Sequence, residues 1–359
     1  MSRFDSNASK VGVIKRVKEL LERAARGDAD VKQKVDKANE ALVRLKALSG
    51  ATHVDSTLSS ISVQYRNEDF IGSRLMPTVM VPKKSNTFFK YSKRDILATP
   101  DDSMSNRSTA NEVNANRSTD NYSVKPYALA NTIDASELHN QDAPLNEMVD
   151  LVALINDQLA LAQEKRHATV LTTAANYAGN TATKSGTTQW SDYSTYTESP
   201  AEAIATARDA IWNPAQGPSR LVGFTSRAVF NKLRRHPTII TDFKHQSGLR
   251  LPTAAQLAEY FELDELLIGG AWEDTANEGQ SASYGRIWGK DFGIVRVAQS
   301  PGIRHASFGY TFQFEDKFTW EQFDPEVGVK GGYRAKVGWE VDEKVVAPDT
   351  GYLLKAVIA

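Results

Sequence analysis

Hydrophobic and polar positions repeat with different periods at the two ends of the chain. Residues 10–48 place apolar side chains at helical spacing, and Gly27 interrupts the pattern, which predicts two helices. Near the other end, residues 308–314 and 333–341 alternate between apolar and polar side chains. A period of two is typical of half-buried strands, so we expect two strands there.

The longest regular pattern follows Pro144, a residue favoured at the first position of a helix. Its apolar stripe continues to about Tyr177, which predicts one helix about 50 Å long that serves as a spine. The next segment, residues 179–188, is rich in Gly, Ser and Thr and predicts a flexible loop. A further helix is expected at residues 200–212, with Ser199 as its cap.

Short buried runs then alternate with helical patterns from Leu221 onward. We expect strands at 221–224, 265–268, 287–288 and 294–297, and helices from Thr225 or Ser226 to Arg235 and over 253–261. This alternation predicts a compact α/β unit set into a larger domain.

A polar arm with two strand-like runs, residues 87–94 and 122–129, is the most informative segment. Between residues 99 and 121 the only large apolar side chains are Met104 and Val113. Ordering the backbone there costs roughly 1–2 kcal/mol per residue, whereas burying each of these two side chains returns about 1.5–3 kcal/mol. We therefore expect the tip to be mobile unless another chain orders it, which indicates a protein built for assembly.

Composition excludes several classes of protein. The chain has 359 residues, a formal net charge of −1 and no cysteine. The charge argues against a protein whose whole surface binds nucleic acid, and the lack of cysteine excludes disulfides and thiolate metal sites. No apolar run approaches the ~20 residues that span a bilayer, and we expect no membrane partner.

Sequence motifs give no positive sign of an enzyme, a cofactor or a metal site. Residues 179–185 approach a phosphate-binding loop but lack the glycine before Lys184. The six histidines show no helical zinc spacing. The aromatic residues Phe308, Tyr310, Phe312 and Phe314 would suit a base-stacking platform, but basic residues are not interleaved with them, so core packing is favoured.

The order of these parts resembles one family. The segments that carry the resemblance are an extended run at 58–71, Met76-Pro77, residues 81–85, the long helix after Pro144, and the closing strands at 332–349. Together they resemble the major capsid proteins of tailed bacteriophages, whose fold is shared with encapsulin shells and the floor of herpesvirus capsids.

The resemblance implies an α+β fold with an N-arm, an E-loop hairpin, a peripheral (P) domain with a spine helix, and an α/β axial (A) domain. The expected parts are an N-terminal helical segment at 1–50, an extended N-arm at 51–80, the E-loop hairpin at 81–135, the P domain at 136–218, the A domain at 219–299 and the C-terminal P-domain strands at 300–359.

By the same resemblance, the chain would assemble as pentamers and hexamers into an icosahedral shell around double-stranded DNA, in a virion capsid formed in the host cytoplasm. The E-loop would lie over a neighbouring subunit's spine, with contacts expected from Lys93, Arg94, Asp95, Arg107 and Arg117. A portal, scaffold or decoration protein is a further expected partner. The alternatives are an encapsulin-like compartment that holds a protein cargo, a nucleic-acid-binding module that uses the aromatic strands, and an enzyme of unrecognised type.

Basic residues on the N-terminal helices suggest where the chain would contact DNA. Lys10, Lys15, Lys18 and Arg23 are expected to face the lumen and to bind DNA without sequence preference, with an ordinary solvated helix face as the alternative.

Two departures from family patterns give further expectations. Some relatives form a lysine–asparagine isopeptide bond late in the P domain, but this chain has no asparagine after Asn277, so no such crosslink is expected there. Some relatives also lose a long N-terminal segment to a protease, whereas we expect residues 1–50 to remain in the particle.

Overall fold

The computed structural model describes residues 67, 70–91, 99, 101–104, 109, 111–112, 117–140, 146–211, 219–244, 251–277, 279–300, 305 and 307–359. The helices expected at residues 10–48 lie outside this range. All descriptions below concern the described residues.

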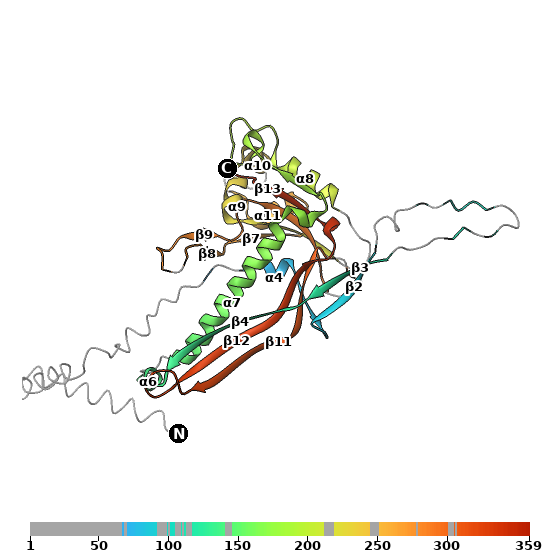
Figure 1. Ribbon diagram of the computed structural model, residues 1–359. Coiled ribbons are helices and arrows are strands. Elements are labelled where there is room, and N and C mark those ends of the chain that lie inside the picture. The colour runs from blue at the N-terminus through green and yellow to red at the C-terminus, as the bar shows by residue number, and fades with distance from the viewer. Residues whose placement is uncertain are drawn as a thin grey trace, which may run out of the picture. The chain divides into compact units, whose positions relative to one another are not determined.

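A four-stranded sheet has the order β1-β11-β12-β4 (Figure 1). Its strands are β1 (Thr78–Val81), β4 (Lys125–Asp134), β11 (Gly309–Asp324) and β12 (Gly332–Val345). β1 runs parallel to β11, and the other two pairs are antiparallel. The two strands predicted from the period-two pattern are therefore confirmed as the central pair β11 and β12.

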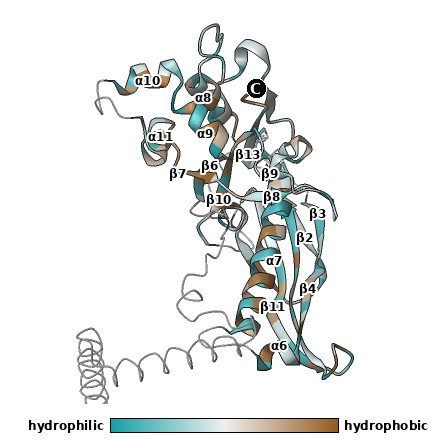
Figure 2. Ribbon diagram, turned by 90° about the vertical axis from the view of Figure 1, so that its left-hand side faces the viewer, coloured by the Kyte–Doolittle hydropathy of each residue, from teal (hydrophilic) through white to brown (hydrophobic). Residues whose placement is uncertain are grey.

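The spine helix α7 (Glu147–Thr172) covers one face of this sheet. Its buried residues Ile155 and Leu159 pack on Ala335 and Val337 of β12. Figure 2 shows hydrophobic and hydrophilic bands alternating along α7, as expected for a helix with one buried side. Its 26 residues make it about 39 Å long.

The expected end of the spine helix at Tyr177 is wrong by five residues. After Thr172 the chain enters a 3₁₀ turn, η1 (Ala174–Tyr177). The Tyr177 hydroxyl donates to the carbonyl oxygen of Leu171, and the Asn176 amide donates to that of Val170. These side chains satisfy carbonyl groups at the end of the helix, and the buried Tyr177 ring stacks on Phe308.

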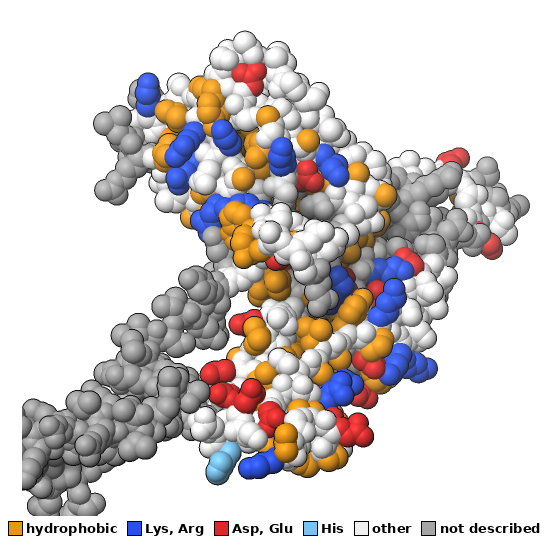
Figure 3. All heavy atoms as spheres, turned by 60° about the vertical axis from the view of Figure 1, so that its left-hand side comes forward, with side chains coloured by type: hydrophobic (Ala, Val, Ile, Leu, Met, Phe, Trp, Pro, Cys, Tyr) orange, Lys and Arg blue, Asp and Glu red, His pale blue; other side chains and the backbone are white. Residues whose placement is uncertain are grey.

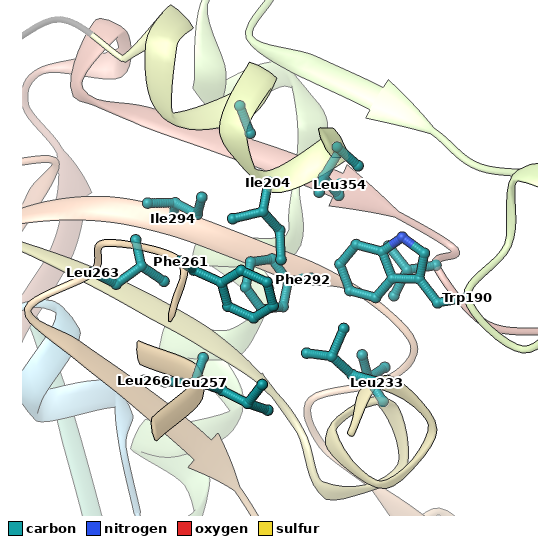
Figure 4. Packing of buried hydrophobic residues seen from close by; sticks show 14 of the residues in the cluster. Trp190, Ile204, Leu233, Leu257, Phe261, Leu263, Leu266, Phe292, Ile294 and Leu354 are labelled. Carbon is teal, nitrogen blue, oxygen red and sulfur yellow. The ribbon is translucent and has the colours of Figure 1, made fainter. Parts of the chain in front are cut away.

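A second sheet of five strands has the order β5-β13-β10-β6-β7. The strands are β5 (Thr181–Thr183), β6 (Ser219–Ser226), β7 (Glu265–Gly269), β10 (Phe292–Ala298) and β13 (Gly351–Lys355). A hydrophobic core, shown in Figure 4, joins this sheet to four helices, α8 (Pro200–Ala210), α9 (Arg227–Leu233), α10 (Pro237–Phe243) and α11 (Ala254–Tyr260). Strands β5 and β13 come from outside residues 219–299, so this sheet extends beyond the A-domain range expected from the sequence.

Helix caps in this region follow the sequence closely. The side chain of Ser199 caps α8, that of Ser226 caps α9 and that of Thr253 caps α11, each by accepting a hydrogen bond from a backbone N–H in the first turn. The expected helices and the strands at 221–224, 265–268 and 294–297 are confirmed, although α8, α9 and α11 end one or two residues earlier than expected.

Three local expectations are wrong. Residues 179–188 form β5 and a 3₁₀ turn, η2 (Gly186–Thr188), because β5 pairs in parallel with β13. Ile287 and Trp288 do not form a strand but lie in a turn after β9 (Tyr284–Arg286), and Trp288 is buried there. Strand β9 pairs with β8 (Trp272–Asp274). The extended N-arm expected at 51–80 is interrupted by a single helical turn, α4 (Gly72–Leu75), that buries Leu75.

The hairpin consists of β2 (Ser85–Tyr91) and β3 (Arg117–Ser123), paired antiparallel from Ser85↔Ser123 to Tyr91↔Arg117. The returning run expected at residues 122–129 is not one strand. The run changes its pairing partner at Val124, because β3 before it pairs with β2 and β4 after it pairs with β12. The short helix α6 (Ala135–His139) follows β4. The expected tip was also too long, because β3 already begins at Arg117.

Candidate assembly surfaces

The hairpin is anchored at its base on the outer sheet face, which we define as the face of the four-stranded sheet opposite α7. The Tyr122 ring stacks on Phe312 with centroids 4.8 Å apart, and Phe88 lies 5.9 Å from the same ring. Val79 and Val81 of β1 pack against this cluster. Phe312 therefore links both hairpin strands to the sheet.

Four polar contacts surround this aromatic cluster. The Lys344 Nζ lies 2.6 Å from Asp120 Oδ1 and also donates to the backbone oxygen of Asn121. The backbone N–H of Ser123 donates to Asp342 Oδ2 at 2.9 Å. Lys84 pairs with Glu340 at 2.8 Å. Together, the rings and charges fix the direction in which the hairpin leaves the sheet.

A buried polar cluster, the Glu164 hub, lies in the C-terminal half of the spine helix. The Glu164 carboxylate accepts hydrogen bonds from the backbone N–H groups of Ile71 and Gly72 and from the indole Nε1 of Trp288, each at 2.9 Å. Burial raises the pKa of Glu164, and these three donors act in the opposite direction. The hub thus joins α7 to the segment before β1 and to the turn that holds Trp288.

His167, one turn further along α7, continues the hub. Its Nε2 lies 3.0 Å from the Thr311 hydroxyl, which itself donates to the carbonyl oxygen of Met76 at 3.1 Å. Because that hydroxyl proton is committed to Met76, Nε2 of His167 must be the donor. Burial, together with the charge of Arg166, lowers the pKa of His167 to about 4, so the ring is neutral at pH 7.

Gly72 permits this close approach. A Cβ atom at this position would lie 2.5 Å from His167 Nδ1 and 2.7 Å from Glu164 Oε2, which is too close for any side chain. The hub is not among the sites expected from the sequence. The signal was present, since Glu164 and His167 fall three residues apart on a helix, next to the apolar Ala168 and Leu171.

Most of the contact residues expected from the sequence lie outside the described part of the chain. Lys93, Arg94, Asp95 and Arg107 lie outside the described residues, as do the expected DNA-facing residues Lys10, Lys15, Lys18 and Arg23. The backbone of Arg117 is described, and it pairs with Tyr91 at the start of β3, which places it at the far end of the paired hairpin strands.

Within the described part of the chain, no group of three His, Cys, Asp or Glu residues is placed to hold a metal ion. None of the helices described there is long and apolar enough to cross a membrane. The core packing expected for the aromatic residues is confirmed, because Phe308, Tyr310 and Phe312 are 0–9% exposed and pack inside hydrophobic clusters.

Comparison with known proteins finds sequence relatives among phage capsid proteins. No protein-family model matches the chain. The major capsid protein of Pseudomonas phage JBD67 is 28% identical over 309 residues, which cover 85% of this chain and 97% of that protein. The major capsid protein of Burkholderia phage BcepMu is 25% identical over 274 residues, covering 74% of this chain and 85% of that protein.

Solved structures agree on the fold. A phage-related protein from Bordetella bronchiseptica RB50 superposes with a TM-score of 0.61 at 21% identity, over 85% of this chain and 97% of that one. The capsid of cyanophage P-SCSP1u superposes with a TM-score of 0.55 at 11% identity, over 85% and 91% of the two chains. The chain therefore has the α+β fold of tailed-phage major capsid proteins. Over most of its length the chain is also similar in sequence to the major capsid proteins of phages JBD67 and BcepMu.

Proposed function

We propose that this chain assembles as pentamers and hexamers into an icosahedral shell that encloses double-stranded DNA. The observation that carries this proposal is the homology to a phage major capsid protein along 97% of that protein's length. No enzymatic step is part of the proposed role.

The hairpin supports an assembly role. Its base is fixed by Phe312 and Lys344, whereas Met104, in the segment between the two strands, is 59% exposed. A hairpin held only at its base gains order when a second chain packs on it. We therefore keep Lys93, Arg94, Asp95, Arg107 and Arg117 as proposed contacts with a neighbouring copy.

Each such contact is weak alone, since exposed ion pairs contribute about 0–1 kcal/mol. Stability of a shell would come from repetition of the contacts and from symmetric closure. The proposed lumenal residues Lys10, Lys15, Lys18 and Arg23 would neutralise phosphates, and a portal, scaffold or decoration protein would complete the particle.

Particle contents test this proposal. Particles purified from the producing host would be treated with nuclease, imaged by negative-stain electron microscopy, and analysed for protected nucleic acid and for co-purifying protein. Closed shells with protected double-stranded DNA are expected. Shells filled with a protein cargo would support the encapsulin-like alternative, and dispersed protein would contradict a shell role.

A further inference from the structure

Among the described residues, the hairpin does not cover the far half of the outer sheet face. Ala335 and Val337 of β12 face α7, so the alternate residues Arg334 and Lys336 lie on the outer face. There Lys336 is paired across the strands with Trp320, and Gly338 with Phe318. In the described part of the chain, the hairpin base contacts the other half of this face, at Phe312 and at residues 340–344.

Aromatic and basic side chains are interleaved on this uncovered half. Phe318 and Trp320 are each 45% exposed. A hollow of about 490 Å³ is lined by Ala130, Trp320, Arg334 and Lys336, among others, with Asp324 as its acidic lining residue. Neither Arg334 nor Lys336 forms an ion pair with any carboxylate of the described residues. Exposed Trp and Arg in a hollow are typical of the central residues of protein interfaces.

The solvent side of α7 carries the complementary pattern. Asp150, Leu154 and Asp157 follow at spacings of four and three residues, so they form one stripe on the helix. All three are exposed, and Leu154 is 49% exposed. The Lys317 ammonium of the same chain interacts electrostatically with Asp157. Figure 3 shows Asp and Glu side chains gathered with hydrophobic ones on the lower part of the face it presents.

We propose that the uncovered outer sheet face of one copy docks on the Asp150–Leu154–Asp157 stripe of a second copy. Trp320 packs on Leu154, while Arg334 and Lys336 meet the two aspartates. The sheet face is basic and the helix stripe is acidic, so the second copy is the occupant that charge complementarity favours.

The contact is heterologous, because the two surfaces lie on opposite sides of the same sheet. Each copy therefore gives its sheet face to one neighbour and its helix stripe to another, which is the arrangement that closes rings of subunits. This inference rests on the proposed shell function and names one of the contacts within it.

A charge-swap series in the full chain tests the contact. Variant A is Arg334→Glu with Lys336→Glu, variant B is Asp150→Lys with Asp157→Lys, and variant C combines all four changes. Variants A and B each place like charges opposite one another, so the yield of closed particles should fall at least about tenfold. Variant C restores opposite charges and should assemble to within about twofold of the unchanged chain.

A matched control separates this contact from a general effect of net charge. Variant D adds Lys83→Glu and Lys290→Glu to variant B, so that it has the same net charge as variant C without the complementary pair of surfaces. Variant D should stay as defective as variant B. Thermal unfolding of the dispersed subunits should show all four variants folded.

Assembly of A and B at the yield of the unchanged chain would overturn the contact, as would failure of C or rescue by D. These results leave the proposed shell function intact as long as the unchanged chain forms particles. An unchanged chain that stays dispersed would overturn the shell function, and this contact with it.

Discussion

The carboxylate of Glu164 on the spine helix accepts a hydrogen bond from the indole Nε1 of Trp288 at 2.9 Å, across 124 residues of sequence. Its two oxygens also accept hydrogen bonds from the backbone N–H groups of Ile71 and Gly72. One buried side chain thus holds the segment leading to β1, the spine and the turn after β9 in a single arrangement. Since β1 leads directly to the hairpin, this hub also determines where the hairpin starts.

Replacing the hub carboxylate should destabilise the subunit. In Glu164→Gln the amide NH₂ would face backbone or indole donors, leaving at least one buried N–H without an acceptor. We expect the free energy of unfolding to fall by about 1–3 kcal/mol. Urea unfolding of dispersed subunits measures this, with Glu259→Gln, an exposed glutamate, as a control that should change little. Equal stability of the two variants would show that the hub contributes nothing.

Gly72→Ala should disturb the hub by crowding. The added Cβ would overlap His167 and Glu164, and overpacking of this kind costs about 1–3 kcal/mol. Gly285→Ala is the matched control, because its Cβ would lie 3.4 Å from Thr275, an ordinary contact. Thermal unfolding should show a lower midpoint for Gly72→Ala alone, and a lowered midpoint for both variants would contradict the account.

His167 should make stability depend on pH. Its pKa is about 4 in the folded chain, below its ordinary value of 6.5, so the unfolded chain binds the proton more readily. The stability that this group contributes is complete above pH 6.5 and is lost as pH falls from 6.5 toward 4, by up to about 3 kcal/mol. The loss would be smaller in a chain without this imidazole.

The variant His167→Gln keeps a donor toward Thr311 and removes the titration. Urea unfolding at several pH values should therefore give a flatter profile between pH 4 and 6.5. Some slope should remain, because burial also lowers the pKa of His236. An unchanged slope in His167→Gln would exclude the histidine as a source of acid lability.

Lys344→Ala should loosen the base of the hairpin without unfolding the sheet. The variant loses the contacts with Asp120 and with the carbonyl oxygen of Asn121. Since Lys344 is partly exposed, we expect about 1 kcal/mol of local stability to be lost. Hydrogen exchange should be several-fold faster at residues 119–123 and unchanged in β12. Lys290→Ala, at an exposed lysine, should leave exchange at the hairpin unaltered.

Periodic segments could be predicted from sequence because local pattern and burial agree in them. The alternation at residues 308–314 and 333–341, the stripe after Pro144, and the cap Ser199 all correspond to the observed elements. In each case the same side chains that set the period are the ones that the fold buries or uses as caps.

Elements that depend on distant partners could not be predicted. β5 forms only because β13, about 170 residues later, supplies its pairing edge. The single turn α4 has no periodic signal, and it is held by Glu164, a residue 92 positions away from Gly72. The returning run likewise divides at Val124 because its first part, β3, pairs with β2 and its second part, β4, pairs with β12.

The most direct test of the central claim is cryo-electron microscopy of the assembled full chain at a resolution that shows side chains. The account predicts closed shells in which density for the hairpin between β2 and β3 lies against a second copy. A chain that remains monomeric at high concentration, or shells in which every hairpin contacts only its own subunit, would contradict it.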